Sequence, residues 1–146
     1  MPTAAKSVAA LLFAALAWLV SEQMIPFLPE GMGVSRFSLV NAAIGFVLGW
    51  SISGHRVGLG YIDSIGIGLT TAGSLFITAV FLHSFIQMIE KSMNKLYDGP
   101  AEALVSVFEI ALKNAAMVSH LTPLLILIIG GAVAGLITEF TSYRAS

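Results

Sequence analysis

His83 is the residue of this chain whose type and position are best suited to chemistry. It lies in the motif LHSF, inside an uncharged stretch from Ser64 to Ile89. Ionisable groups in such stretches are costly to bury and often mark functional sites. An imidazole there could ligate a haem or a chlorophyll magnesium, or contact a quinone. His55 and His120 lie at the edges of uncharged stretches, so a bis-histidine haem lacks a second ligand at equal depth. We therefore expect a neutral, hydrogen-bonded His83, with cofactor binding as the alternative.

The carboxylates form no catalytic or proton-transfer pattern. Glu22, Asp63 and Glu139 flank uncharged stretches, and none lies in the middle of one. Carboxylates at the membrane midplane and helices broken at their middle are typical of pumps and transporters. The chain also lacks cysteine, a Ser/His/Asp arrangement and a metal-ligand spacing. We expect these carboxylates to be solvated, and we expect no catalytic residue, no metal site and no enzyme activity.

Glycines provide the clearest packing pattern. Gly45 and Gly49 are four residues apart, and Gly131 and Gly135 repeat that spacing. Small residues at this spacing let two membrane helices approach closely. We expect at least one of the pairs to line a helix contact, either within the chain or between subunits.

Two further Gly-x-Gly pairs, at 58–60 and 66–68, superficially resemble part of a nucleotide-binding loop. That loop requires a strand, a turn and a helix around the glycines, whereas uncharged membrane-like stretches surround these two. We expect no nucleotide site. The formal net charge of -1 likewise leaves no basic excess for nucleic acid.

The composition sets the solvent in which these residues must be positioned. Hydrophobic residues make up 57% of the 146 residues and charged residues only 10%, against about 25% charged in ordinary soluble domains. The chain therefore lacks the polar residues to cover a water-facing surface, and lipid is its expected solvent.

Four uncharged runs predict four transmembrane helices, at about 4–22, 37–54, 64–89 and 121–139. A run of 18 residues forms about 27 Å of helix, close to the ~30 Å hydrocarbon core. Uniformly apolar runs of this length favour helices over the alternating strands of a barrel. The first run could also belong to a signal peptide, but no small-x-small cleavage site follows it. A loop marked by Pro26, Pro29, Gly31 and Gly33 separates the first two runs.

The segment at about 100–119 differs from the four runs. Its polar residues recur at helical spacing, and an apolar stripe follows on the opposite side, so we expect an amphipathic helix in the membrane interface or against other helices. The polar stripe comprises Glu102, Ser106, Glu109, Lys113 and His120, and the apolar stripe comprises Leu104, Val105, Phe108, Leu112 and Ala115. The predicted fold is a single all-α integral membrane domain over residues 1–146, with about four spans and one amphipathic helix.

Several segments also carry a family resemblance that covers nearly the whole chain. The chain resembles the TrgA family of membrane proteins from photosynthetic and related alphaproteobacteria, a family named for tellurite resistance. The similar segments are PTAAKSVAALLFAALAW (Pro2–Trp18), VNAAIGFVLGW (Val40–Trp50), GLTT (Gly68–Thr71), LHSF (Leu82–Phe85) and YDGPAEALVSVFE (Tyr97–Glu109).

Relatives of that family resemble an extra transmembrane subunit of the purple-bacterial reaction centre–light-harvesting core complex. The resemblance implies a non-catalytic accessory subunit in the bacterial inner membrane, cytoplasmic or intracytoplasmic, that keeps a gap in the antenna ring for quinone passage. Its partners would be membrane lipid and the reaction-centre and light-harvesting polypeptides. Bacteriochlorophyll, carotenoid, quinone or lipid would lie nearby without a resident cofactor. The alternative is a stand-alone protein that contributes to tellurite resistance, and a third possibility, a small haem or quinone redox protein, depends on His83.

Overall fold

The computed structural model describes residues 3–28 and 33–145, and the side chain of residue 118 lies outside the description. Within these ranges the chain forms helices and no strand. The five α-helices are α1 (Thr3–Met24), α2 (Val34–Leu48), α3 (Tyr61–Met93), α4 (Pro100–Val118) and α5 (Leu121–Arg144). A short 3-10 turn η1 (Ile25–Phe27) follows α1, and a π-helical segment η2 (Gly49–Ser53) extends α2. The all-α prediction is confirmed.

Four of the helical segments are long and apolar enough to cross a membrane: Thr3–Phe27, Val34–Ser53, Tyr61–Met93 and Leu121–Arg144. Each overlaps one of the four predicted spans, and α4 (Pro100–Val118) overlaps the predicted amphipathic helix. Pro29 and Gly31, which mark the predicted loop, lie outside the described residues.

The third span is longer than the uncharged run that predicts it. Helix α3 has 33 residues, which is about 50 Å and well above the ~30 Å hydrocarbon thickness. A charge ends an uncharged run, but it does not end a helix, so α3 continues through Glu90 and Lys91. It stops at Asn94, and Lys95 then adopts the left-handed φ of 55°. Helix α5 likewise continues past Glu139 to Arg144.

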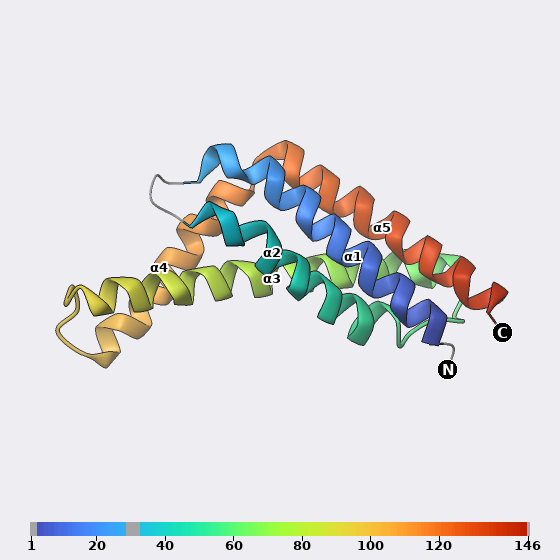
Figure 1. Cartoon of the computed structure of the whole chain (residues 1–146), viewed down its shortest axis with the longest axis horizontal. Helices are drawn as coiled ribbons and strands as arrows, with labels where there is room; N and C mark the ends of the chain where they lie inside the picture. The colour runs from blue at the N-terminus through green and yellow to red at the C-terminus, as the bar shows by residue number, and fades with distance from the viewer. Residues whose placement is uncertain (1–2, 29–32, 146) are drawn as a thin grey trace.

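Helices α1, α2 and α5 and the first half of α3 form one bundle (Figure 1). Both termini and the α2–α3 loop lie together at one end of this bundle. The η1 turn and the start of α5 meet at the other end, where the ring of Phe27 stacks on His120 with centroids 4.4 Å apart. This arrangement is the one that four crossings require.

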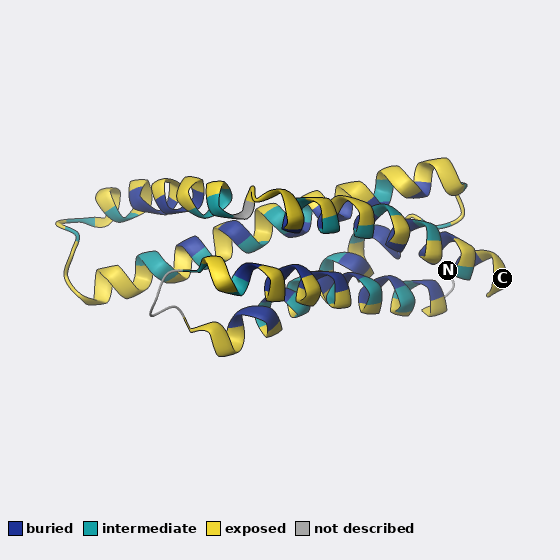
Figure 2. Ribbon diagram, turned by 90° about the horizontal axis from the view of Figure 1, so that it is seen from above, coloured by how far each residue is buried: buried dark blue, intermediate teal, exposed yellow. Residues whose placement is uncertain are grey.

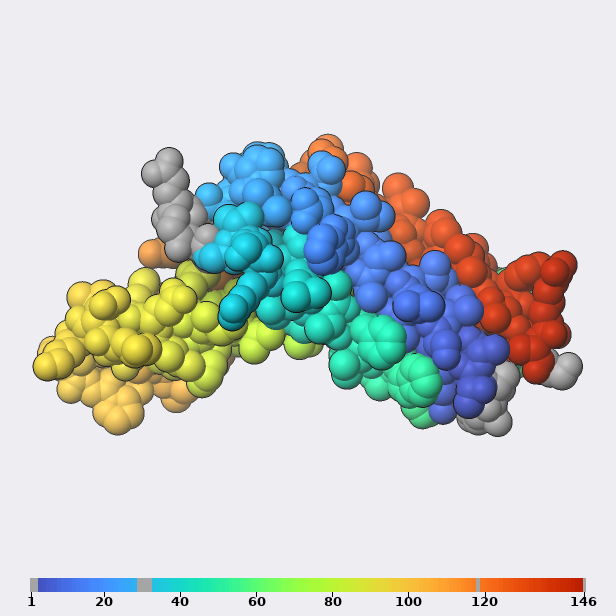
Figure 3. Space-filling view, in the orientation of Figure 1, coloured from blue at the N-terminus to red at the C-terminus, as the bar shows by residue number. Residues whose placement is uncertain are grey.

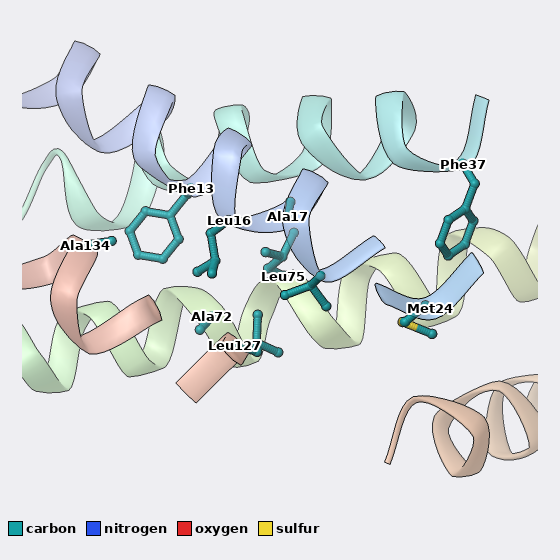
Figure 4. Packing of buried hydrophobic residues seen from close by; sticks show 10 residues of the cluster. Phe13, Leu16, Ala17, Met24, Phe37, Ala72, Leu75, Leu127 and Ala134 are labelled. Atoms are coloured by element: carbon teal, nitrogen blue, oxygen red, sulfur yellow. The ribbon is translucent and has the colours of Figure 1, made fainter. Parts of the chain in front are cut away.

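The apolar core lies where α1 crosses α3 and α5. Phe13, Leu16 and Ala17 of α1 face Leu75 of α3 and Leu127 of α5 (Figure 4). Buried residues follow the inner faces of the helices, and their outer faces are exposed (Figure 2). In a membrane these outer faces are the surfaces that lipid or partner proteins cover.

The rest of α3 and all of α4 form a helical hairpin that leaves the bundle, which we call the α3–α4 arm (α3 from residue 80 onward, and α4). The arm gives the molecule an arched outline (Figure 3). Helix α4 packs on α3 through buried Val107, Ile110 and Ala111. The predicted apolar stripe of α4 mostly faces outward. Its large members are exposed, namely Leu104, Val105, Phe108 and Leu112, whereas Ala115 is half-buried.

Candidate functional site

A cavity of about 70 Å³ lies where the α3–α4 arm meets the bundle. We call it the His83 cavity. All five helices contribute to its wall, and the polar side chains that line it are Ser21, Asn41, His83, Gln87 and Asn114. Most of the remaining wall is aliphatic or aromatic, and includes Val20, Leu75, Phe76, Val80, Met117 and Leu127.

A chain of three hydrogen bonds crosses from α1 to α3 at this cavity. The Ser21 hydroxyl donates to the Ala17 carbonyl oxygen at 2.7 Å, and Asn41 Nδ2 donates to Ser21 Oγ at 2.8 Å. Asn41 Oδ1 lies 2.9 Å from His83 Nε2. The ring of Phe37 covers one side of the imidazole, with centroids 4.6 Å apart.

The direction of these three hydrogen bonds determines the tautomer of His83. The Ser21 hydroxyl proton is used on the Ala17 carbonyl, so Asn41 must present its NH₂ group to Ser21 and its oxygen to His83. An amide oxygen only accepts, so His83 donates from Nε2. In the neutral imidazole the proton on Nε2 leaves a lone pair on Nδ1. His83 therefore keeps one hydrogen-bond acceptor for a further group.

A second polar group lies beside His83. The Ser84 hydroxyl donates to the Val80 carbonyl at 2.6 Å and accepts from Asn114 Nδ2 at 3.0 Å, which joins α4 to α3. Gln87 Nε2 is buried and has no hydrogen-bond partner within the described residues. A buried donor without a partner loses its hydration and gains nothing in return, so the position of this amide carries a cost in free energy.

The other two histidines contact other residues. His55 Nδ1 lies 3.0 Å from the Trp50 carbonyl oxygen, and its Nε2 lies 3.1 Å from Lys6 Nζ, at the end of the bundle where the termini meet. His120 stacks on Phe27. Among the residues the structure describes, no group of three or more His, Cys, Asp or Glu side chains could hold a metal ion. Among the described residues of the cavity wall, His83 is the one histidine.

The sequence predicts a solvated Glu139, and this prediction is wrong. The side chain is buried, with 1% of its surface exposed. Its Oε2 accepts from the backbone N–H of Gly58 and its Oε1 from that of Gly60, both at 2.8 Å. Both glycines have positive φ, 87° and 104°, a conformation that suits glycine and turns both amides toward one acceptor. The Gly58–Gly60 pair thus serves as a clasp between the α2–α3 loop and α5. By contrast, Glu22 is exposed and accepts from the Ser38 hydroxyl at 2.6 Å.

Gly45 and Gly49 lie at the contact between the first two spans. A Cβ on Gly45 would overlap the backbone of Phe13, and a Cβ on Gly49 would lie 2.9 Å from Phe13 Cβ and 3.0 Å from the Ala9 carbonyl carbon. No side chain fits at either position unless α1 moves away. The same row of α2 carries Asn41, so the glycine contact also brings Asn41 to Ser21.

Gly131 and Gly135 lie at a second contact, between α5 and α3. A Cβ on Gly131 would lie 2.7 Å from the Ala72 Cβ, and a Cβ on Gly135 would lie 3.2 Å from Gly68 Cα and overlap the carbonyl of Ser64. Both glycine pairs therefore serve contacts within the chain.

The sequence analysis missed the partner row on α3: Ser64, Gly68 and Ala72 repeat small residues every fourth position. This spacing is visible in the sequence, but Gly68 enters the sequence analysis only in a Gly-x-Gly pair with Gly66 and in the GLTT segment. A Cβ on Gly66 would meet no atom within 4 Å, whereas a Cβ on Gly68 would overlap the backbone of Gly131. Gly68 therefore contributes to helix packing as part of the row of small residues four positions apart, and not as part of the Gly-x-Gly pair.

Comparison with protein-family models, with curated proteins and with solved structures finds no match to this chain. The assignment to a membrane therefore rests on the four long apolar helices themselves. The resemblance to the TrgA family, and the partners that it implies, remain predictions from the sequence.

Proposed function

We propose that this protein is a non-catalytic accessory subunit of a larger membrane complex and that it binds its partner through the α3–α4 arm. The observation that carries the proposal is the outward apolar row of α4. Leu104 is 61% exposed, Phe108 56% and Leu112 73%. These large side chains line α4, which packs within the chain mainly against α3.

The bundle supports this division of roles because its small residues are used internally. The glycine rows of α2 and α5 pack on α1 and α3, so neither row is left to bind another subunit. The arm differs in this respect. Helix α4 is joined to α3 by one apolar row, by the ring contact of Phe108 with Phe81 and by the Asn114–Ser84 hydrogen bond. More than half of the surface of its outer row stays exposed for a partner.

A shallow groove beside α4 adds to the surface of the arm. Ile77, Phe81, Leu82 and Phe85 of α3 line it together with Val107 of α4. Phe81 also packs edge-on against Phe108, with ring centroids 6.0 Å apart. Aromatic side chains contribute large contact areas at interfaces. An apolar ridge next to an apolar groove is a surface that suits a transmembrane helix of another subunit.

The resemblance described above names the partner that we propose, the reaction centre–light-harvesting core of a bacterial inner membrane, and the role of keeping a gap in its antenna ring for quinone passage. The fold supports only the coarser part of this proposal, a membrane protein with an outward-facing arm. The identity of the complex depends on the resemblance alone.

Co-purification from gently solubilised membranes tests the proposal. We expect the tagged chain to migrate on a native gel with other membrane polypeptides, which mass spectrometry then identifies. The variant Phe108→Ala/Leu112→Ala should reduce the co-purified partner at least about tenfold, as expected when central interface anchors are truncated. Leu39→Ala/Val47→Ala is the matched control, since both residues are equally exposed on α2. A wild-type chain that migrates alone, or equal losses in both variants, would contradict the proposal.

The stand-alone alternative has its own measurement. If the wild-type chain migrates alone, a deletion strain should be grown on tellurite, and increased sensitivity would support a contribution to tellurite resistance. Unchanged sensitivity would remove that alternative as well.

A further inference from the structure

Two unused hydrogen-bonding positions lie one helical turn apart in the wall of the His83 cavity. Gln87 Nε2 is a buried donor without a partner, and His83 Nδ1 carries a lone pair that makes no hydrogen bond within the described residues. Residues at i and i+4 project from the same face of a helix. Both residues line the cavity, so one donor and one acceptor come from neighbouring turns of its wall.

The charge of a group that would use both positions follows from the rest of the wall. Among the described residues no Asp, Glu, Lys or Arg lines the cavity, and the polar side chains of its wall are amides, a hydroxyl and an imidazole. A charged head would have no counter-charge there, and an unpaired charge in an apolar site is strongly unfavourable. Anionic lipid headgroups, metal ions and ammonium groups therefore do not suit this wall, and a neutral head does.

The location of the cavity indicates the nature of the rest of the ligand, beyond its neutral polar head. Its wall is formed by the end of α1, the start of α2 and the second half of α3, so the cavity lies near one end of the bundle. A volume of about 70 Å³ is several times the ~10–15 Å³ that one water molecule needs. Most of the lining is apolar, and such a surface favours hydrocarbon over water.

We propose that the His83 cavity binds the hydroxyl head of a neutral, lipid-soluble alcohol or phenol. The hydroxyl donates to His83 Nδ1 and accepts from Gln87 Nε2, and the apolar body lies against Leu75, Phe76 and Leu127. A carbonyl would satisfy only Gln87, because it cannot donate to Nδ1. The Ser21–Asn41–His83 chain positions the imidazole by holding its Nε2, so the acceptor nitrogen remains available to the ligand. This inference concerns a site separate from the outward row of α4, and it does not rest on the proposed subunit role.

Photoaffinity labelling of the full chain in detergent micelles tests the proposal. The probe is a dodecanol with a diazirine in its chain, and labelled peptides are mapped by mass spectrometry. We expect saturable labelling of peptides that line the cavity. Excess dodecanol should abolish it, whereas dodecane, which lacks the hydroxyl, and dodecyl phosphate, which is charged, should compete at least about tenfold less well. Competition by dodecane equal to that by dodecanol would overturn the proposal, and so would labelling that does not saturate, as expected if water alone fills the cavity.

Two substitutions locate the hydroxyl. Gln87→Leu removes the donor and should weaken probe binding about fivefold to tenfold, the usual consequence of losing one buried hydrogen bond. Gln23→Leu makes the same chemical change on the exposed side of α1 and should leave binding unchanged. Wild-type affinity in Gln87→Leu, with helicity by circular dichroism intact, would overturn the proposed contact.

His83→Phe keeps a planar ring and removes Nδ1, so we expect a similar weakening of probe binding. The comparison of dodecanol with dodecane uses the wild-type chain, so it decides the proposal even if a variant does not fold. Because no partner protein is present in these measurements, their outcome is independent of the co-purification experiment.

Discussion

Pairs of helices pack in opposite ways in the bundle and in the α3–α4 arm. In the bundle, backbones meet at glycines: Gly68 of α3 faces Gly131 and Gly135 of α5 without side chains between them. In the arm, α4 meets α3 through the branched side chains of Val107 and Ile110 and through a side-chain hydrogen bond. The bundle buries its smallest residues, whereas the arm exposes its largest ones.

This difference teaches where contact energy is found when lipid is the solvent. Hydrocarbon surrounds apolar side chains as well as a protein core does, so burial of Leu or Phe drives helix association weakly, and close packing and hydrogen bonds contribute more. Ser, Thr, Asn and Glu side chains are accordingly found among the buried residues of the bundle, while many Leu, Ile and Phe side chains face outward. Large exposed apolar residues are therefore expected on the bundle, where lipid covers them. The outward apolar row of the amphipathic helix α4 says more about where a partner binds.

The largest effect is expected from a side chain inserted at the α3–α5 contact. Gly68→Leu places atoms where the Gly131 backbone lies, so we expect a loss of about 3 kcal/mol in the free energy of unfolding, the upper part of the range for overpacking. Gly131→Leu should lose about 1–3 kcal/mol for the same reason. Unfolding in mixed detergent micelles gives the measurement.

The matched control for that change lies on the same helix. A Cβ on Gly73 would meet no atom within 4 Å, so Gly73→Leu should leave the free energy of unfolding within about 0.5 kcal/mol of wild type. Equal losses for Gly68→Leu and Gly73→Leu would show that the α3–α5 contact is not made by backbones.

The next largest loss of stability is expected when the clasp between Glu139 and the α2–α3 loop is removed. Glu139→Ala leaves the N–H groups of Gly58 and Gly60 without their acceptor, at a loss of about 1.5–3 kcal/mol for hydrogen bonds to a charged group. Amide hydrogen exchange at these two glycines should accelerate. Glu109→Ala, on the exposed surface of α4, is the control and should change neither quantity. Unchanged exchange in Glu139→Ala would contradict the role of the clasp.

The hydrogen-bond chain beside the cavity should contribute less. Asn41→Ala removes the bonds to Ser21 and His83, and we expect a loss of about 1–2 kcal/mol, two bonds of ordinary net strength. Asn94→Ala removes a single exposed amide bond at the end of α3 and should lose less than about 0.5 kcal/mol. A thermal melt in detergent compares the two variants. The same loss of stability in both variants would mean that the Ser21–Asn41–His83 hydrogen bonds do not join α1, α2 and α3.

The smallest effect is expected on the outer face of the arm. Leu112→Ala should change the free energy of unfolding of the isolated protein by no more than about 0.5 kcal/mol, because the residue touches little of its own chain. Ile110→Ala, two residues away on the buried side, should lose at least about 1 kcal/mol. A Leu112→Ala loss that matched Ile110→Ala would show that the outer row packs on this chain and is not free to bind a partner.

Part of this architecture was accessible from the sequence. The uncharged runs and the amphipathic spacing at 100–119 predicted four spans and one further helix, because exclusion of charge from hydrocarbon is a local rule. Span ends were less accessible: α3 continues for four residues beyond Ile89, since a helix tolerates charges outside the membrane. The glycine pairs could be recognised by their spacing, but the spacing did not say which helices they join.

The candidate site was less accessible. His83 stood out because a histidine in an uncharged run is rare, and Gln87 follows it at helical spacing. Nothing in the sequence joined either residue to Asn41 of α2 or Asn114 of α4. Glu139 was misjudged for the same reason. A carboxylate at the end of a span is ordinarily solvated, and its burial follows from two glycine amides about eighty residues away in the sequence.

The sequence by itself determined the solvent and the number of helices, because the transfer of each residue between water and hydrocarbon depends on that residue and its near neighbours. Only the tertiary structure decided which glycines meet, where Glu139 finds its donors and which face of α4 stays open. Those outcomes depend on atoms distant in the chain that come within hydrogen-bonding or van der Waals distance, and no local pattern of residues records them.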